Sequence, residues 1–111
     1  MFARLLGIPG ISVEKVAEQL GTPSLHIFDA NHQSAWAAGH VPGAQNVDPG
    51  EFTQSNLPDN PDATVVFYCG GQFCPMASGA AVRARKMGYT NVFVMTEGIA
   101  GWIEKGQPVE T

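Results

Sequence analysis

Residues 64–68, TVVFY, form a continuous apolar and β-branched run that leads into the loop CGGQFCP and then into a helical pattern. Such a run is typical of a strand covered on both faces, since a half-exposed strand alternates apolar and polar residues. Parallel sheets are built from a buried strand that a loop and a helix follow. The stretch therefore favours an α/β fold, with a parallel or mostly parallel sheet and helices on both faces.

Strand-like and helix-like stretches alternate along the rest of the chain, as this fold class requires. Residues 48–63, rich in Pro, Asp and Asn, predict a loop with one helical turn near Phe52. The other predicted strands are residues 24–28 and 91–95, with a short extended piece at 44–47. The predicted helices are residues 12–20, 31–38, 76–87 and 99–105.

The ends of these helices carry the expected residue types. Ser12 and Asn31 are predicted N-caps because their side chains can accept hydrogen bonds from the first helical N–H groups. Gly21, Gly39 and Gly88 follow the last helical residues, where glycine commonly ends a helix.

Three helices have a predicted packing face. In the first helix this face consists of Val13, Val16, Ala17 and Leu20. In the final helix, Ile99, Trp102 and Ile103 are expected to face inward, and Trp102 is interpreted as a core residue. Arg83 and Arg85 are expected to lie on a solvated face of the longest helix, with the alternative that one of them steers an anionic donor. The packing face of that helix is predicted to be Ala77, Ala80, Ala81, Ala84 and Met87.

Length and composition predict one globular domain over residues 1–111. Hydrophobic residues make up 44% of the chain and charged residues 14%, which is sufficient for a packed core. The net charge of −4 argues against a protein that binds nucleic acid through its phosphates. No apolar run reaches the roughly 18 residues of a membrane span, and the N-terminal MFARLLGIPG is too short for a secretory signal. We therefore expect a cytoplasmic location without membrane or nucleic-acid partners.

Cys69 and Cys74 are the only cysteines, fewer than a secreted disulfide scaffold would contain. A closed zinc site needs four ligands, and His26, His32 and His40 show no ligand spacing with the cysteines. We expect no metal and no cofactor.

Cys69 stands where chemistry is usual in this fold class, because ligands bind at the carboxyl ends of parallel strands. Gly70 and Gly71 allow the loop to turn its N–H groups inward, and the following helix adds partial positive charge. A thiolate in such a place has a lowered pKa and is nucleophilic. No Lys or Arg lies in residues 69–78, so any activation must come from amides and the helix dipole. The alternative is that Cys69 is a small buried hydrophobic residue at a strand end.

Cys74 also has two interpretations. It can pack beneath the loop, or it can stand at the start of the helix just before Pro75. Proline is well suited to the first position of a helix. Alternatively, Cys74 can be a resolving thiol that attacks an oxidised or persulfidated Cys69. The separation of the two cysteines differs from the Cys-x-x-Cys spacing of thioredoxin-like motifs.

Residues 11–108 resemble a rhodanese-like domain. The similarity depends on several motifs in the family's order, each weak alone and specific as a set. These are GHVPGAQNV at residues 39–47, the strand and cysteine VVFYC ending at Cys69, GYTNV at residues 88–92 and EGIAGW at residues 97–102.

The resemblance implies sulfur transfer through a persulfide on Cys69. The cysteine at this position would take a sulfane sulfur from a donor such as thiosulfate and pass it to cyanide, a thiol or a protein acceptor. The pocket would consist of backbone N–H groups, which can stabilise the thiolate, the persulfide and the donor oxyanion. These belong to Gly70, Gly71, Gln72, Phe73 and Cys74.

The chain departs from the family pattern in the cysteine loop, which binds the donor, and at two other places. The loop lacks the basic residue that helps many members bind thiosulfate, and the span from Cys69 to Gly88 is slightly longer than usual. Asp29-Ala30-Asn31 stands where Asp-x-Arg is common, and Glu97-Gly98 stands where Gly-Gly is common. These last two differences are interpreted as structural.

Three other functions remain open. Cys69 and Cys74 can form the disulfide of a thiol redox protein, or the domain can be a non-enzymatic interaction module. A phosphatase or arsenate reductase is disfavoured because the loop has no arginine to clamp a phosphoryl group. Asp29 and His40 are expected to fix local backbone, His40 in the turn at residues 39–43, rather than to act in chemistry.

Overall fold

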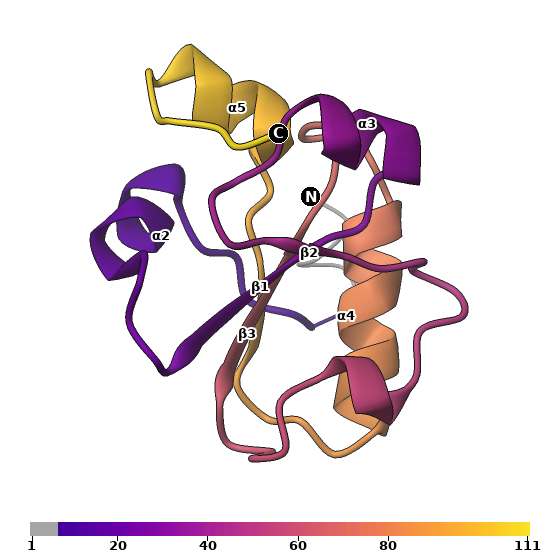
Figure 1. Cartoon of the computed structure of the whole chain (residues 1–111). Helices are drawn as coiled ribbons and strands as arrows, with labels where there is room; N and C mark the ends of the chain where they lie inside the picture. Colours follow the sequence, from indigo (N-terminus) through magenta and orange to yellow (C-terminus); the bar gives the residue numbers. More distant parts are fainter. Residues whose placement is uncertain (1–6) are drawn as a thin grey trace.

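The computed structural model describes residues 7–111, in which four parallel strands form one sheet in the order β2-β1-β3-β4 (Figure 1). The central strand β3 lies between β1 and β4 and is buried from Val65 to Tyr68. The strands are β1 (Leu25–Asp29), β2 (Gln45–Asn46), β3 (Thr64–Tyr68) and β4 (Val92–Val94). The predicted α/β class and parallel sheet are confirmed.

Helices cover both faces of this sheet, with α4 on one side and α2 and α5 on the other (Figure 1). A short 3-10 helix, η1 (Gln54–Asn56), is the helical turn expected near Phe52. The α-helices are α2 (Val13–Gln19), α3 (Gln33–Ala38), α4 (Met76–Lys86) and α5 (Gly98–Glu104). None of these helices in residues 7–111 is both long and apolar enough to cross a membrane.

Alternate residues of β3 divide the core into two halves. Val65 and Phe67 belong to the half packed under α4, whereas Val66 and Tyr68 belong to the half packed under α2 and α5. Successive side chains of a strand point to opposite faces, so a continuous apolar run serves both halves. Trp102 of α5 is fully buried, as predicted.

The predictions for Asn31 and Ile103 are wrong. The N-cap of α3 is His32 rather than Asn31, because the side chain of Asp29 accepts the Asn31 N–H at 2.8 Å and holds it in a turn before the helix. Ile103 is 55% exposed, since it lies about 100° around the helix from the buried Trp102. Ser12 does cap α2, and its hydroxyl oxygen accepts from the Lys15 N–H at 3.1 Å.

Arg83 is not part of a solvated face. Its Nε donates to the carbonyl oxygen of Phe52 at 2.8 Å, and its guanidinium lies 5.4 Å from the centroid of the Phe52 ring. Arg85 is exposed, as expected. Arg83 of α4 therefore binds the loop after β2 at Phe52.

Candidate functional site

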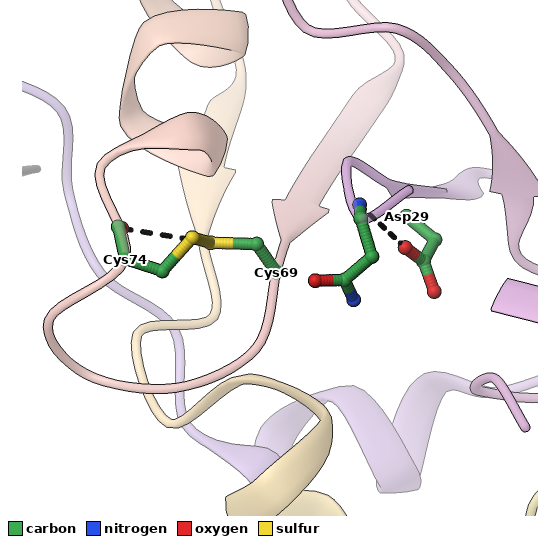
Figure 2. The surroundings of a disulfide bond; sticks show 4 residues. Asp29, Cys69 and Cys74 are labelled. Carbon is green, nitrogen blue, oxygen red and sulfur yellow. Dashed lines mark hydrogen bonds between the residues drawn. A yellow bond between two sulfur atoms is a disulfide. The ribbon is translucent and has the colours of Figure 1, made fainter. Parts of the chain in front are cut away.

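Cys69 directly follows β3, and the loop after it leads to α4 (Figure 2). Its side chain is joined to Cys74 by a disulfide, with the two Cα atoms 6.4 Å apart. Cys69 is 2% exposed, and Cys74 is partly buried against the core half under α4. The structure thus brings together the two residues predicted as nucleophile and resolving thiol.

The loop between the cysteines presents four free N–H groups. Those of Gly70, Gly71, Gln72 and Phe73 have no acceptor within residues 7–111. The expected fifth donor is not free, because the Cys74 N–H donates to the carbonyl oxygen of Gly71 at 3.3 Å. Pro75 is the N-cap of α4 rather than its first residue, so the positive end of the helix dipole follows the loop directly.

Helix α5 fixes the direction of the first two N–H groups. The N–H groups of Ile99 and Ala100 donate to the carbonyl oxygens of Cys69 and Gly70 at 2.9 and 3.0 Å. In a planar trans peptide the C=O and the following N–H point in opposite directions. Because both carbonyls face α5, the N–H groups of Gly70 and Gly71 face away from it.

Gly98 allows this close approach. A Cβ atom at Gly98 would lie 2.6 Å from the Cys69 carbonyl oxygen and 2.6 Å from the Gly71 nitrogen. Its φ of +63° is also one that L residues rarely adopt. From the sequence, Gly98 is distinguished only as a family difference, and its contact with the loop is not predicted. A glycine just before a predicted helix is the available signal.

The space beside the disulfide is small. The cavity that includes Cys69, Gly71, Gln72 and Cys74 in its wall has a volume of about 10 Å³, room for roughly one water molecule. A wider hollow of about 300 Å³ is lined by Gly71–Phe73 and by residues of α5. Phe73, at the rim of the loop, is 76% exposed.

Lys105, the cation in the wall of this hollow, is already paired. Lys105 Nζ lies 2.7 Å from Glu97 Oε2 and 2.9 Å from Glu14 Oε2. Hydrogen bonds to the two carboxylates raise the pKa of Lys105, and the bond from Lys105 lowers the pKa of Glu14. On the other side of the loop, the neutral side chain of Asn31 faces Gly70, its Oδ1 3.8 Å from where a Cβ would stand. An anion at this loop would therefore meet backbone and side-chain amides rather than an unpaired side-chain cation.

A buried network fixes the end of β3. The Tyr68 hydroxyl donates to Asp29 Oδ2 at 2.7 Å and accepts from the Val41 N–H at 3.0 Å. Burial and the neighbouring Asp29 carboxylate raise the pKa of Tyr68. Asp29 also accepts from Asn31, so its predicted role in fixing the backbone is confirmed. The network holds the residue immediately before Cys69.

His40 and Trp102 have structural roles away from the sulfur atoms. The Nδ1 of His40 binds the carbonyl oxygen of Trp36 at 2.8 Å, and its main chain pairs with Glu110. His40 therefore joins the end of α3 to the C-terminal segment, rather than acting only within the turn at residues 39–43. The indole Nε1 of Trp102 donates to the Pro108 carbonyl at 2.6 Å. Across residues 7–111, no group of three or more His, Cys, Asp or Glu side chains is placed to hold a metal ion.

The family profile described as "Rhodanese-like domain" matches residues 12–105. The chain belongs to the rhodanese-like family. The strand β3, the cysteine loop and the helix α4 of this rhodanese-like chain all lie within the matched residues. The resemblance drawn from the sequence motifs is confirmed.

The names of similar proteins indicate different functions. An HTH-type transcriptional regulator of Mycobacterium tuberculosis is 29% identical over 97% of the chain, which spans only 48% of that regulator. The human thiosulfate:glutathione sulfurtransferase is 26% identical over 91% of the chain and 98% of its own length. The crystal structure of the BH2092 protein from Bacillus halodurans has a TM-score of 0.85 at 18% identity, covering 96% of this chain and 80% of that one. The last comparison supports the fold alone.

Proposed function

We propose that this rhodanese-like chain is a sulfurtransferase that carries a sulfane sulfur as a persulfide on Cys69. The observation that carries the proposal is the loop after Cys69, with four N–H groups that have no acceptor within residues 7–111. Such donors stabilise an anion at the place where a thiolate, a persulfide and a departing oxyanion would form. The name of the human relative supports the reaction class.

The reaction would have two displacement steps. The Cys69 thiolate attacks the outer sulfur of a donor such as thiosulfate, the donor's S–S bond breaks, and sulfite leaves with the electron pair. An acceptor thiolate or cyanide then attacks the outer sulfur of the persulfide, and the Cys69 thiolate leaves. Because a disulfide-bonded Cys69 has no free thiolate, the reactive form is the reduced one.

We propose that residues 1–111 act as one rhodanese-like domain, using small sulfur-containing donors and thiol, cyanide or protein acceptors. A reducing compartment such as the cytoplasm would keep both cysteines available.

Intact-protein mass spectrometry tests the proposal. Reduced wild type, Cys69→Ser and Cys74→Ser are incubated separately with thiosulfate and with a polysulfide. We expect wild type or Cys74→Ser to gain one sulfur atom that dithiothreitol removes, and Cys69→Ser to gain none. Dithiothreitol distinguishes a persulfide from a sulfinic acid of nearly equal mass, which thiols do not reverse. Wild type and Cys74→Ser both failing to react with either donor would overturn the proposal, as would equal charging of Cys69→Ser.

A thiol redox function is a second candidate, favoured by the Cys69–Cys74 disulfide. Its test is mild peroxide applied to the reduced protein. A redox protein would form the intramolecular disulfide, which thiols reverse, without any dependence on a sulfane donor. Oxidation that stops at a sulfenic or sulfinic acid on Cys69 would exclude this function.

A further inference from the structure

The two cysteine sulfur atoms occupy one confined place in the fold. Cys69 and Cys74 are within disulfide reach, with their Cα atoms 6.4 Å apart, inside the range that a disulfide spans without backbone movement. Cys69 is 2% exposed, and its Sγ lies 3.5 Å from the carbonyl oxygen of Cys74. The nearest thiol to a persulfide on Cys69 is therefore supplied by the chain itself.

We propose that Cys74 reduces the persulfide on Cys69 and releases hydrosulfide, so that the chain acts as a sulfane-sulfur reductase. This inference rests on the proposed function, because it needs Cys69 to accept a sulfane sulfur first. It adds a product, sulfide, that simple transfer to an external acceptor does not give.

The step is balanced within the protein. The Cys74 thiolate attacks Sγ of the Cys69 persulfide, a Cys69–Cys74 bond forms, and the bond from Sγ to the outer sulfur breaks. The outer sulfur leaves with the electron pair as hydrosulfide. Two cysteine sulfurs end as a disulfide, while the sulfane sulfur is reduced to the level of sulfide.

The geometry favours attack on the inner sulfur. Cys74 is within disulfide reach of Cys69 Sγ itself. The cavity of about 10 Å³ beside the two cysteines has room for one water-sized atom, and its wall includes Gly71 and Gln72. The outer sulfur of a persulfide directed into this cavity would lie beside the N–H groups of Gly71 and Gln72. Those donors can stabilise the departing hydrosulfide anion.

Regeneration requires an external dithiol, the chemical class of reductant that the cycle consumes. One thiolate of the dithiol attacks Sγ of Cys74, the less buried of the two cysteines, and releases the Cys69 thiolate. The second thiol of the reductant then displaces Cys74 and leaves as a disulfide. Cys69 and Cys74 return to the reduced state, ready for the next donor.

The test uses the reduced full chain without oxygen or added thiol. Wild type, Cys74→Ser, Cys74→Ala and Met76→Ser are mixed with a polysulfide, and protein mass and sulfide are followed over time. Met76→Ser is the matched control, since it removes another sulfur atom two residues further along the chain. A sample without donor controls for oxidation by residual air.

We expect wild type and Met76→Ser to end two hydrogen atoms lighter than the reduced protein, with Cys69 linked to Cys74 in peptide maps. They should release one more equivalent of sulfide per chain than the Cys74 variants, which should keep one added sulfur. Wild type that charges and retains its sulfur as long as Cys74→Ser would overturn this inference while leaving the proposed function intact. A persulfide found on Cys74 would also overturn it. If the Cys74 variants gain no sulfur and wild type forms no disulfide, the proposed function fails as well.

Discussion

Gly98 lies directly against the main chain of Cys69, so close that a Cβ atom at residue 98 would be 2.6 Å from the Cys69 carbonyl oxygen. Real Cβ atoms do not approach backbone oxygen this closely, and the neighbours here are backbone rather than flexible side chains. The start of α5 and the cysteine loop are therefore shaped by the absence of one methyl group.

Gly98→Ala should displace the loop that follows Cys69. We expect a loss of about 2–4 kcal/mol in the free energy of unfolding, from overpacking and from a φ of +63°. Sulfur loading of Cys69 should fall even where the variant remains folded. Urea unfolding and intact mass after polysulfide treatment measure the two effects.

Gly106→Ala is the matched control for Gly98→Ala. Gly106 has a similar φ of +77°, but nothing lies within 4 Å of its added Cβ. Gly106→Ala should lower the free energy of unfolding by only about 1–2 kcal/mol, because of backbone strain. Cys69 of this variant should load sulfur as in wild type. Equal loading by both variants would show that the Gly98 contact does not shape the loop.

Tyr68→Phe should destabilise the fold by about 1–3 kcal/mol, because a buried donor to Asp29 and a buried acceptor for the Val41 N–H are lost together. Urea unfolding at neutral pH measures the change. A loss below about 0.5 kcal/mol, the range of an ordinary surface substitution, would contradict the assigned role of the network.

The advantage of wild type over Tyr68→Phe should shrink at alkaline pH. Burial and the Asp29 carboxylate raise the pKa of Tyr68 above its ordinary value of 10.0. Above that pH the unfolded chain loses the Tyr68 proton while the folded chain keeps it, so the unfolded state is favoured. The stability difference should be full below pH 10 and fall by up to about 1.4 kcal/mol per pH unit above it. Parallel unfolding curves on both sides of this pH measure the difference, and a constant difference would mean that Tyr68 ionises normally in the folded state.

Gln72→Arg should improve the use of thiosulfate. The loop offers amides but no cation of its own, and a charge-assisted hydrogen bond adds about 1.5–3 kcal/mol of interaction with an anion. We expect kcat/KM for thiosulfate to rise about tenfold and the gain to shrink with added salt. Sulfite release measures the rate.

Gln54→Arg gives the same change of net charge in η1. The turn η1 is followed closely by Pro58, whose carbonyl oxygen accepts a hydrogen bond from the Tyr89 hydroxyl. Tyr89 comes just after the C-terminal end of α4. The turn η1 is thus at the opposite end of α4 from the cysteine loop. An equal gain in this control would indicate long-range attraction rather than binding at the loop.

Arg83→Gln should destabilise the protein by about 1–2 kcal/mol, because it removes the hydrogen bond to the Phe52 carbonyl and the contact with the Phe52 ring. Arg85→Gln makes the same charge change at an exposed position of the same helix and should stay within about 0.5 kcal/mol of wild type. Thermal or urea unfolding compares them directly. Similar values for the two variants would show that the Arg83 contact contributes nothing.

Much of the fold was predictable because its signals are local. The run from Thr64 to Tyr68, the cap at Ser12 and the alanine face of α4 each depend on residues only a few positions apart. Periodicity and capping act over that range, so the elements were placed to within about two residues. Capping patterns predict the wrong residue where another side chain binds the same N–H group. Asn31 is not the N-cap of α3, because its N–H donates to the Asp29 carboxylate.

The sequence by itself determined the parallel α/β architecture, the family and the place of Cys69 after a buried strand. Only the tertiary structure decided that the Cys74 N–H is occupied, that Gly70 and Gly71 turn their N–H groups away from α5, and that Gly98 packs on the loop. These features depend on how α5 and the loop after β3 pack together at the carboxyl ends of the strands. That arrangement is set by packing between segments distant along the chain, which no local pattern of residues specifies.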